Sequence, residues 1–513
     1  MNTNTRKILV WLTPVVVLAL LAIVLIPRLR GPEQLPAPAY WPTEGWQVSP
    51  PEAQGFDSVK LAEGLQAIRQ NGIYIHSLMI IRNGSVLADA YFYPYDGSTY
   101  HDLASVTKSL MTTLIGIAAD QGKLDLDAPM LSFFPSRTIA NRDARKEHIT
   151  VRHLASMTAG LDCDAMNDEK TLDAMRASED WVQFALDRRV VSEPGTHFVY
   201  CGLQMHLLSA ILQEATGMTA LEFARANLFG PLGISDVYWP ADPQGYTHGW
   251  GDVCLHPHDM AKLGFLFLHQ GQWDGRQIVS REWVADSTKA QIATGPNRGE
   301  DYGYGWWIAR ADEEIYYFSA DGRGGQRIVV VPTLNLVLVT TGGGFESDEV
   351  IPYVVAAMAD MEEALPANTT GVAQLEAVVA ELSQPPVAQT VPPLPETAQA
   401  ISGQTFVFEP NSLSIRSLRL DFDASSEAIF TLDLASEESP RIVGVGLDGV
   451  YRPSHGGRPA VARGSWSDET TFKVDYDEGP GLATLILRMR FDDDRVLFEV
   501  VGFGSFEGTL ERP

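Results

Sequence analysis

Residues 101–122 (HDLASVTKSLMTTLIGIAADQG) contain both a helix pattern and a possible nucleophile. The apolar residues recur with the spacing of one helical face, at Leu110, Leu114, Ile117 and Ala118. The pattern predicts a buried helix from Ser105 to Gln121, and Gly122 suits the turn that ends it. Ser105 and Lys108 form an S-x-x-K pattern at the start of this helix, and a spacing of three residues places both side chains on one face.

This placement gives the serine and the lysine a chemical use. A serine at a helix N-terminus lies beside backbone N–H groups that have no partner within the helix, and these groups can stabilise an oxyanion. The positive end of the helix dipole and partial burial both disfavour a proton on Lys108. A neutral lysine can take the proton of Ser105 and make its oxygen a nucleophile. Serine and lysine are common residues, so the pattern needs support from elsewhere in the chain.

A second candidate lies in residues 193–202 (EPGTHFVYCG), where a turn delivers Tyr200 just before another apolar helix. A phenol that is hydrogen-bonded to a lysine ammonium ionises more easily, so Tyr200 could act as a general base or proton relay. Taken alone, the segment also fits a tyrosine that packs its ring at the base of a loop.

The composition limits the classes of protein that the chain could belong to. Its 513 residues are 45% hydrophobic and 20% charged, which is typical of a globular protein of two or three domains. The net charge of −27 repels phosphate backbones and argues against a nucleic-acid partner. The three cysteines, Cys163, Cys201 and Cys254, form no C-x-x-C pair, which argues against a structural zinc site or a disulfide framework. Whether two of them form a single bridge stays open.

The N-terminal segment predicts contact with a membrane. Ile8 to Ile26 carries no charge and would form a helix about 28 Å long, close to the thickness of the hydrocarbon core of a bilayer. We therefore expect residues 1–30 to be an uncleaved anchor and residues 31–52 a Pro-rich spacer. A cleaved signal peptide and a buried helix are the alternatives. We expect the body to lie outside the cytoplasm, in a periplasmic or extracellular location.

The order of predicted elements gives the fold class. In residues 53–365, a hairpin with an Asn83-Gly84 turn comes first, a helical zone follows, and strands return between 306 and 341. Strands at both ends with helices between them predict one antiparallel sheet flanked by helices, an α+β fold. Residues 366–400 are expected to be a helix and a Pro-rich linker. Residues 401–513 show short alternating strands and predict a small antiparallel sandwich or barrel, whose protein partner, if it has one, is unknown.

Taken together, the motifs resemble those of the serine β-lactamases and penicillin-binding proteins, most closely the class C-related branch with its esterases and 6-aminohexanoate-dimer hydrolases. The S-x-x-K pattern, the P-G-x-x-F-x-Y turn ending at Tyr200, and residues 149–161, 231–234 and 257–264 carry this resemblance, which covers about residues 58–361. It implies a β-lactamase/transpeptidase-like sandwich with a helical subdomain. It also implies that Ser105 is the acyl-accepting nucleophile, Lys108 its base and Tyr200 the proton relay to the leaving group, with no metal or organic cofactor.

The chain departs from the pattern of this family at two motifs. The usual Y-x-N is Tyr200-Cys201-Gly202, which lacks the carboxamide that binds the side-chain amide of a β-lactam. The usual Lys-Thr-Gly or His-x-Gly falls in residues 320–326 (ADGRGGQ), where either 320–322 or 323–325 could occupy its place. The predicted substrate-binding and oxyanion residues are accordingly Gly322, Arg323, Gly324, Gly325 and Gln326.

In the second register Arg323 would meet a substrate carboxylate, whereas the first register supplies no cation. In either register a backbone N–H of this strand could be the second oxyanion donor. Both departures favour hydrolysis of an ester or amide over that of a β-lactam.

Other possible sites have less support. His256-Pro257-His258 lacks a third metal ligand at a usual spacing. Residues 248–252 (HGWGD) fit a surface turn better than a cleft lining, and Trp306-Trp307 fits the core. Cys201 fits a small buried residue better than a nucleophile.

The sequence therefore predicts a serine hydrolase that acts through an acyl-enzyme on a small-molecule ester or amide or a short peptide. Two alternatives remain open. One is a D-Ala-D-Ala-type cell-wall peptidase, and the other is a catalytically silent module that binds wall components or peptides.

Overall fold

The structure is a computed structural model, and it describes residues 35–98, 100–164, 168–295, 299–310, 315–422, 426–435, 437, 439–454, 460–478 and 484–511. It divides into two compact units. Of the described residues, the first unit, the body, comprises those within 35–90, 102–341 and 345–379, and the second, the barrel unit, comprises those within 91–101, 342–344 and 380–511. The expected anchor at Ile8–Ile26 lies outside the described residues. Within the described ranges, no helix is both long enough and apolar enough to cross a membrane.

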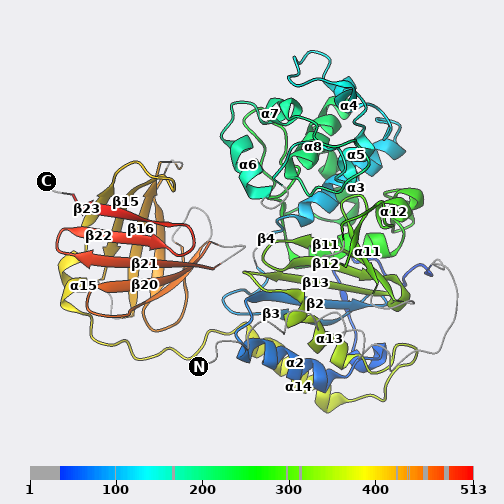
Figure 1. The fold of residues 1–513 in the computed structure, drawn as a ribbon. Coiled ribbons are helices and arrows are strands. Elements are labelled where there is room, and N and C mark those ends of the chain that lie inside the picture. The colour runs from blue at the N-terminus through cyan, green and yellow to red at the C-terminus, as the bar shows by residue number, and fades with distance from the viewer. Residues whose placement is uncertain are drawn as a thin grey trace, which may run out of the picture. The chain divides into compact units, whose positions relative to one another are not determined.

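The body contains a nine-stranded sheet with the order β1-β3-β2-β13-β12-β11-β10-β9-β8 (Figure 1). Its strands are β1 (Gln47–Val48), β2 (Ile75–Arg82), β3 (Ser85–Tyr91), β8 (Ile292–Ala293), β9 (Asp301–Tyr302), β10 (Trp307–Arg310), β11 (Tyr316–Gly322), β12 (Gln326–Val331) and β13 (Leu336–Gly342). The predicted hairpin is β2–β3, and Asn83 and Gly84 both have positive φ, as a type I′ turn requires. Strands from both ends of the body share this sheet, which confirms the predicted α+β arrangement.

Helices cover both faces of the sheet (Figure 1). On one side lie α2 (Ser58–Gln70), α13 (Ile351–Ala357) and α14 (Thr369–Leu382), and on the other lie α3 (Val106–Asp120), α11 (Pro257–Leu268) and α12 (Arg281–Ser287). A helical region contains α4 (Ala144–Glu147), α5 (Val151–Ala155), α6 (Asp168–Arg176), α7 (Trp181–Asp187), α8 (Gly202–Thr216), α9 (Ala220–Ala224) and α10 (Gly230–Leu232). Helices α3, α5, α6 and α7 all pack against α8, so α8 is the centre of this region.

Helix α3 is more deeply buried than its sequence pattern indicates. Every residue from Val106 to Ala118 is buried, whereas the pattern predicts one apolar face. Its hydroxyl groups are accommodated by hydrogen bonds to carbonyl oxygens, such as those from Thr112 Oγ1 to Tyr304 O (2.8 Å) and from Thr113 Oγ1 to Ser109 O (2.7 Å). Polar residues on this helix therefore do not mark a solvent-exposed face.

The C-terminal residues form a barrel, one of the two architectures that the sequence leaves open. Its strands are β14 (Thr405–Phe408), β15 (Ile415–Asp421), β16 (Glu427–Leu434), β17 (Arg441–Gly446), β18 (Arg452–Pro453), β19 (Val461–Trp466), β20 (Thr471–Asp477), β21 (Thr484–Asp492), β22 (Arg495–Val500) and β23 (Gly504–Leu510). The order is β17-β16-β15-β14-β23-β22-β21-β20-β19-β18, and pairing of β17 with β19 closes the sheet on itself. The short helix α15 (Glu396–Ile401) precedes the first strand (Figure 1).

Candidate active site

Ser105 lies at a sharp bend just before α3. Ala104 has φ of +45°, a left-handed conformation that is costly for a residue with a Cβ and that often occurs at functional sites. The bend is held by the side chain of Asp102, whose Oδ1 accepts the N–H of Ala104 at 2.8 Å, and by Thr107 Oγ1, which donates to Ala104 O at 2.7 Å. The bend thus places Ser105 at the N-cap position of the helix.

The predicted partners Ser105 and Lys108 are in direct contact. Lys108 Nζ donates to Ser105 Oγ at 2.8 Å and to the carbonyl oxygen of Trp250 at 2.8 Å. The lysine is 2% exposed, so these contacts hold its amine in one position. The same nitrogen lies 4.7 Å from the centre of the Tyr200 ring. The three predicted catalytic residues therefore meet around one nitrogen atom.

Tyr200 lies in an aromatic wall. Its ring stacks on that of Trp307 with centroids 5.7 Å apart, and Phe198 and Tyr302 lie at 6.5 Å from it. Trp306 and Trp307 are both buried, as the sequence predicts, but Trp307 also contacts Tyr200, a predicted catalytic residue.

The backbone next to Tyr200 is held by a buried carboxamide. Gln204 Nε2 donates to Val199 O at 3.1 Å, and Gln204 Oε1 accepts the N–H of Ala159 at 3.1 Å. Val199 N also donates to the carbonyl of Met157 at 2.9 Å. Gln204 is only 1% exposed, so the turn that carries the tyrosine is anchored to the interior of the helical region.

Cys201 forms a disulfide with Cys163, with Cα atoms 6.1 Å apart. The sequence predicts a small buried residue at Cys201 and leaves any pairing open; the residue is buried, but it is also half of a bridge. The bond joins the residue after Tyr200 to the segment that precedes α6. Cys254 is buried and takes no part in this bridge.

Residues 248–252 form a buried part of the site, which corrects the expectation of a surface turn. Trp250 is 4% exposed, and its carbonyl oxygen accepts the hydrogen bond from Lys108. His248 stacks on Trp250 at 4.6 Å, and its Nδ1 lies 2.7 Å from Asp252 Oδ2. Burial alone would raise the pKa of Asp252, but the hydrogen bond with His248 and nearby positive charges, Lys108 among them, outweigh it and lower that pKa.

The third motif approaches Ser105 through Gly322, the last residue of β11. A Cβ added at Gly322 would lie 2.3 Å from the carbonyl oxygen of Leu103 and 3.2 Å from Cβ of Ala104. Only a glycine allows the strand to come so close to the bend before Ser105. This contact favours the register in which residues 320–322 occupy the place of the family motif.

The other predicted residues of this motif lie in the β11–β12 turn. A Cβ at Gly325 would meet the ring of Phe345 at 2.2 Å, and Gly324 has φ of +87°. Gln326 is buried and pairs with Gly322 across the hairpin. Arg323 is 63% exposed, and its guanidinium lies 3.1 Å from a carboxylate oxygen of Glu169 on α6. The structure thus brings Gly322 to the bend and gives Arg323 an ion-pair partner.

The two histidines of the rejected metal motif have separate partners. His256 Nε2 lies 2.9 Å from Asp236, and His258 Nε2 lies 2.7 Å from Asp89. In the part of the chain that the structure describes, no group of three or more His, Cys, Asp or Glu residues could hold a metal ion.

Comparison with known proteins identifies the family. The model of the family described as "Beta-lactamase" matches residues 60–358, more than half of the chain. The chain belongs to the beta-lactamase family. Membership confirms the resemblance that the motifs indicate, and with it the prediction of a beta-lactamase-related serine hydrolase. The match ends before the first barrel strand, β14, begins.

Named relatives of this beta-lactamase-family chain include two hydrolases. The 6-aminohexanoate-dimer hydrolase of Paenarthrobacter ureafaciens is 25% identical over 223 residues, 40% of this chain and 55% of the relative. Esterase EstB of Burkholderia gladioli is 27% identical over 227 residues, 39% of this chain and 58% of the relative. The aligned regions thus span less than two thirds of either relative. The solved structure of EstCE1, a hydrolase with promiscuous acyltransferase activity, superposes with a TM-score of 0.50 at 20% identity, covering 59% of this chain and 99% of that one.

Proposed function

We propose that the chain hydrolyses small esters or amides through an acyl-enzyme on Ser105. The observation that carries this proposal is the 2.8 Å hydrogen bond between Ser105 Oγ and Lys108 Nζ, with the ring of Tyr200 4.7 Å from the same nitrogen. A nucleophile in contact with a base is the arrangement that covalent catalysis requires.

The first half of the reaction forms the acyl-enzyme. Ser105 Oγ attacks the substrate carbonyl while Lys108 Nζ takes its proton. The negative charge that develops on the carbonyl oxygen is stabilised by backbone N–H groups at the start of α3, assisted by a donor from the end of β11 beside Gly322. The bond to the alcohol or amine then breaks, and Tyr200 passes the proton to the leaving group.

The second half returns the enzyme to its resting state. Water attacks the acyl carbon and gives up one proton to Lys108 or Tyr200. The bond from the acyl carbon to Ser105 Oγ breaks, and the serine regains its proton. The products are a carboxylic acid and a free Ser105, so this cycle consumes one water molecule and needs no other reactant.

The walls of the site favour an apolar substrate. Phe198 and Tyr200 are only partly buried and offer apolar surface to an acyl or alcohol group, while the buried rings of Tyr302 and Trp307 pack behind them. Gly202 provides no carboxamide for the amide group of a β-lactam side chain. The names of the esterase and the 6-aminohexanoate-dimer hydrolase among the relatives support an ester or amide as the substrate.

Two alternatives to this function are weaker. A cell-wall peptidase would need a cation for the carboxylate at the end of its peptide, and the candidate, Arg323, already pairs with Glu169. A silent binding module has no need for a lysine held against a serine at 2.8 Å.

The test is hydrolysis of p-nitrophenyl butyrate, with Tyr200→Phe and Lys108→Ala beside the wild type. We expect kcat/KM to fall by about 10²-fold or more in both variants, because each removes a group that moves a proton. Lys123→Ala, which changes an exposed lysine just after α3, should leave it unchanged. A stable adduct with benzylpenicillin and no ester turnover would favour the peptidase, and no reaction with either compound would favour the silent module.

A further inference from the structure

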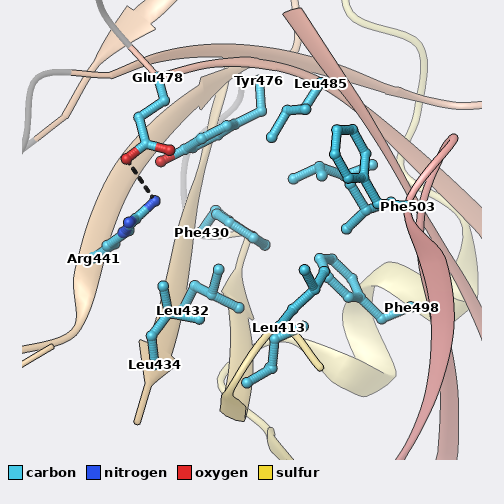
Figure 2. A pocket seen from close by; sticks show the side chains of 13 residues that line it. Leu413, Phe430, Leu432, Leu434, Arg441, Tyr476, Glu478, Leu485, Phe498 and Phe503 are labelled. Atoms are coloured by element: carbon cyan, nitrogen blue, oxygen red, sulfur yellow. Dashed lines mark ion pairs between the residues drawn. The ribbon is translucent and has the colours of Figure 1, made fainter. Parts of the chain in front are cut away.

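The barrel contains a cavity of about 210 Å³ that the hydrolase chemistry does not use (Figure 2). Its wall is made of aliphatic and aromatic side chains that point inward from β15, β16, β21 and β22, including Ile415, Phe430, Leu432, Leu487, Phe498 and Val500. An apolar cavity of about 150 Å³ is large enough to hold benzene, so this one has room for a small organic molecule.

The cavity occupies only one end of the barrel. The other end is filled by aromatic rings: Phe406 lies 5.6 Å from Phe491, and Phe472 lies 5.3 Å from Phe422. Helix α15 lies at that filled end, because the residue after it, Ser402, accepts a hydrogen bond from the N–H of Phe422 just beyond β15. The cavity begins at the opposite end of β15, at Ile415. One end is thus packed and covered, and the other is hollow.

The hollow end has a mouth with apolar walls. Leu432, Leu434 and Leu485 line it and are only partly buried, although they belong to strands of a closed barrel. Phe503, in the turn between β22 and β23, also lines the cavity and is 66% exposed. Large apolar side chains left in water at the entrance of an apolar cavity are typical of a ligand site.

Charged groups gather on one side of this mouth (Figure 2). Arg441 pairs with Glu478 at 3.0 Å and with both carboxylate oxygens of Glu437 at 3.0 Å. One guanidinium between two carboxylates leaves a net negative charge on this cluster. Tyr476 lies beside it, and burial and the charge of Glu478 raise the pKa of its phenol, which therefore keeps a proton to donate.

We propose that the barrel binds a small uncharged apolar molecule, such as a medium-chain alcohol, with its chain in the cavity and its hydroxyl at Tyr476 and Glu478. The negative cluster excludes a fatty-acid carboxylate, because the only guanidinium among the described lining residues already has two carboxylate partners. This site is independent of Ser105, so the proposal does not rest on the hydrolase activity.

The test is photolabelling of the full chain with an eight-carbon alcohol that carries a diazirine, followed by mass-spectrometric mapping. We expect labelled peptides from β16, β21 and β22. The neutral competitor 1-octanol should displace the label at a concentration at least tenfold lower than octanoate. Glu478→Gln removes one carboxylate from the mouth. It should therefore reduce the ratio between the concentrations of octanoate and of 1-octanol that displace the label.

Two variants of one strand separate the cavity from the outer surface. Leu432→Trp fills the cavity and should lower labelling at least tenfold, whereas Thr431→Trp adds the same ring to the outward-facing neighbour and should not. If Leu432→Trp fails to fold, as judged by its thermal midpoint, Leu434→Phe is the smaller filling change. The proposal would be overturned by labelling that persists when a larger side chain fills the cavity, or by labelling spread over other surfaces. Stronger displacement of the label by octanoate than by 1-octanol would also overturn it.

Discussion

At the scale of single residues, the site depends on how closely the chain approaches itself around Ser105. The serine and lysine meet because they are three residues apart on one helix, a contact that could be predicted from the sequence. The hydrogen bond from Lys108 to the carbonyl oxygen of Trp250 could not be predicted, because every residue has a main-chain carbonyl and the residue type does not show which one acts as an acceptor. The pairing of Cys163 with Cys201 was equally hidden, since three cysteines allow more than one pair.

Gly322 provides a test of this close approach. Gly322→Ala would press a methyl group against Leu103 O, where a Cβ would stand at 2.3 Å, and displace the bend before Ser105. We expect kcat/KM for p-nitrophenyl butyrate to fall by about 10²-fold, since catalysis is sensitive to displacements of about 1 Å. Gly217→Ala, just after α8, is the control, because a methyl group there would meet no atom within 4 Å and lies outside the active site. Equal activities of the two variants would contradict this role.

At the scale of elements, local patterns predicted which segments form helices and strands but not how deeply each is buried. Helix α3 is buried all round because other parts of the body pack on every side of it, and a period in one segment cannot report neighbours from elsewhere. The sequence favours a surface turn for residues 248–252, yet Trp250 is buried and its carbonyl oxygen accepts a hydrogen bond from Lys108. Tertiary packing decided both cases.

The disulfide ties the Tyr200 turn to the segment before α6 across 38 residues of sequence. Cys163→Ala should lower the free energy of unfolding by about 3–4 kcal/mol, because without the cross-link the unfolded chain gains the conformational entropy that closing a loop of this length removes. Dithiothreitol should lower the thermal midpoint of the wild type but leave that of the variant unchanged. A response of the variant to dithiothreitol would show that another bridge is involved.

His269, at the end of α11, makes stability depend on pH. It packs against Phe265 at 4.4 Å, and burial lowers its pKa from 6.5 to about 4. The unfolded chain therefore takes up a proton at a higher pH than the folded one, so stability is full above pH 6.5 and is lost as the pH falls toward 4. Protonation of His269 in the unfolded chain therefore lowers the free energy of unfolding by about 2 kcal/mol by pH 5. In urea titrations, His269→Gln should lose less stability between pH 7.5 and pH 5 than the wild type.

At the scale of the whole molecule, the body and the barrel have separate hydrophobic cores. The alternation of residues in the C-terminal strands predicted an antiparallel structure, but it could not distinguish a sandwich from a barrel. Closure depends on the pairing of β17 with β19, two strands whose contact no local pattern encodes. The family motifs predicted the architecture of the body more fully, because they specify long-range neighbours.

Because the cores are separate, a mutation in the core of the barrel should lower the stability of the barrel without changing the activity of the body. Phe472→Ala empties a fully buried position in the barrel and should destabilise that unit by about 3–5 kcal/mol. Ester hydrolysis at 25 °C should stay within twofold of the wild type, because Ser105, Lys108 and Tyr200 all belong to the body. Thermal unfolding and kcat/KM measured on the same sample check both parts. A parallel loss of hydrolysis would show that the body needs an intact barrel.

The most direct test of the central claim is the intact mass of the protein after incubation with a fluorophosphonate, which phosphonylates an activated serine. We predict one adduct on the wild type, located at Ser105 by peptide mapping, and none on Ser105→Ala. Ser178→Ala, which removes a hydroxyl far along the sequence from the nucleophile, should be labelled like the wild type. An adduct that persists in Ser105→Ala, or a folded wild type that forms none, would contradict the assignment of Ser105 as the nucleophile.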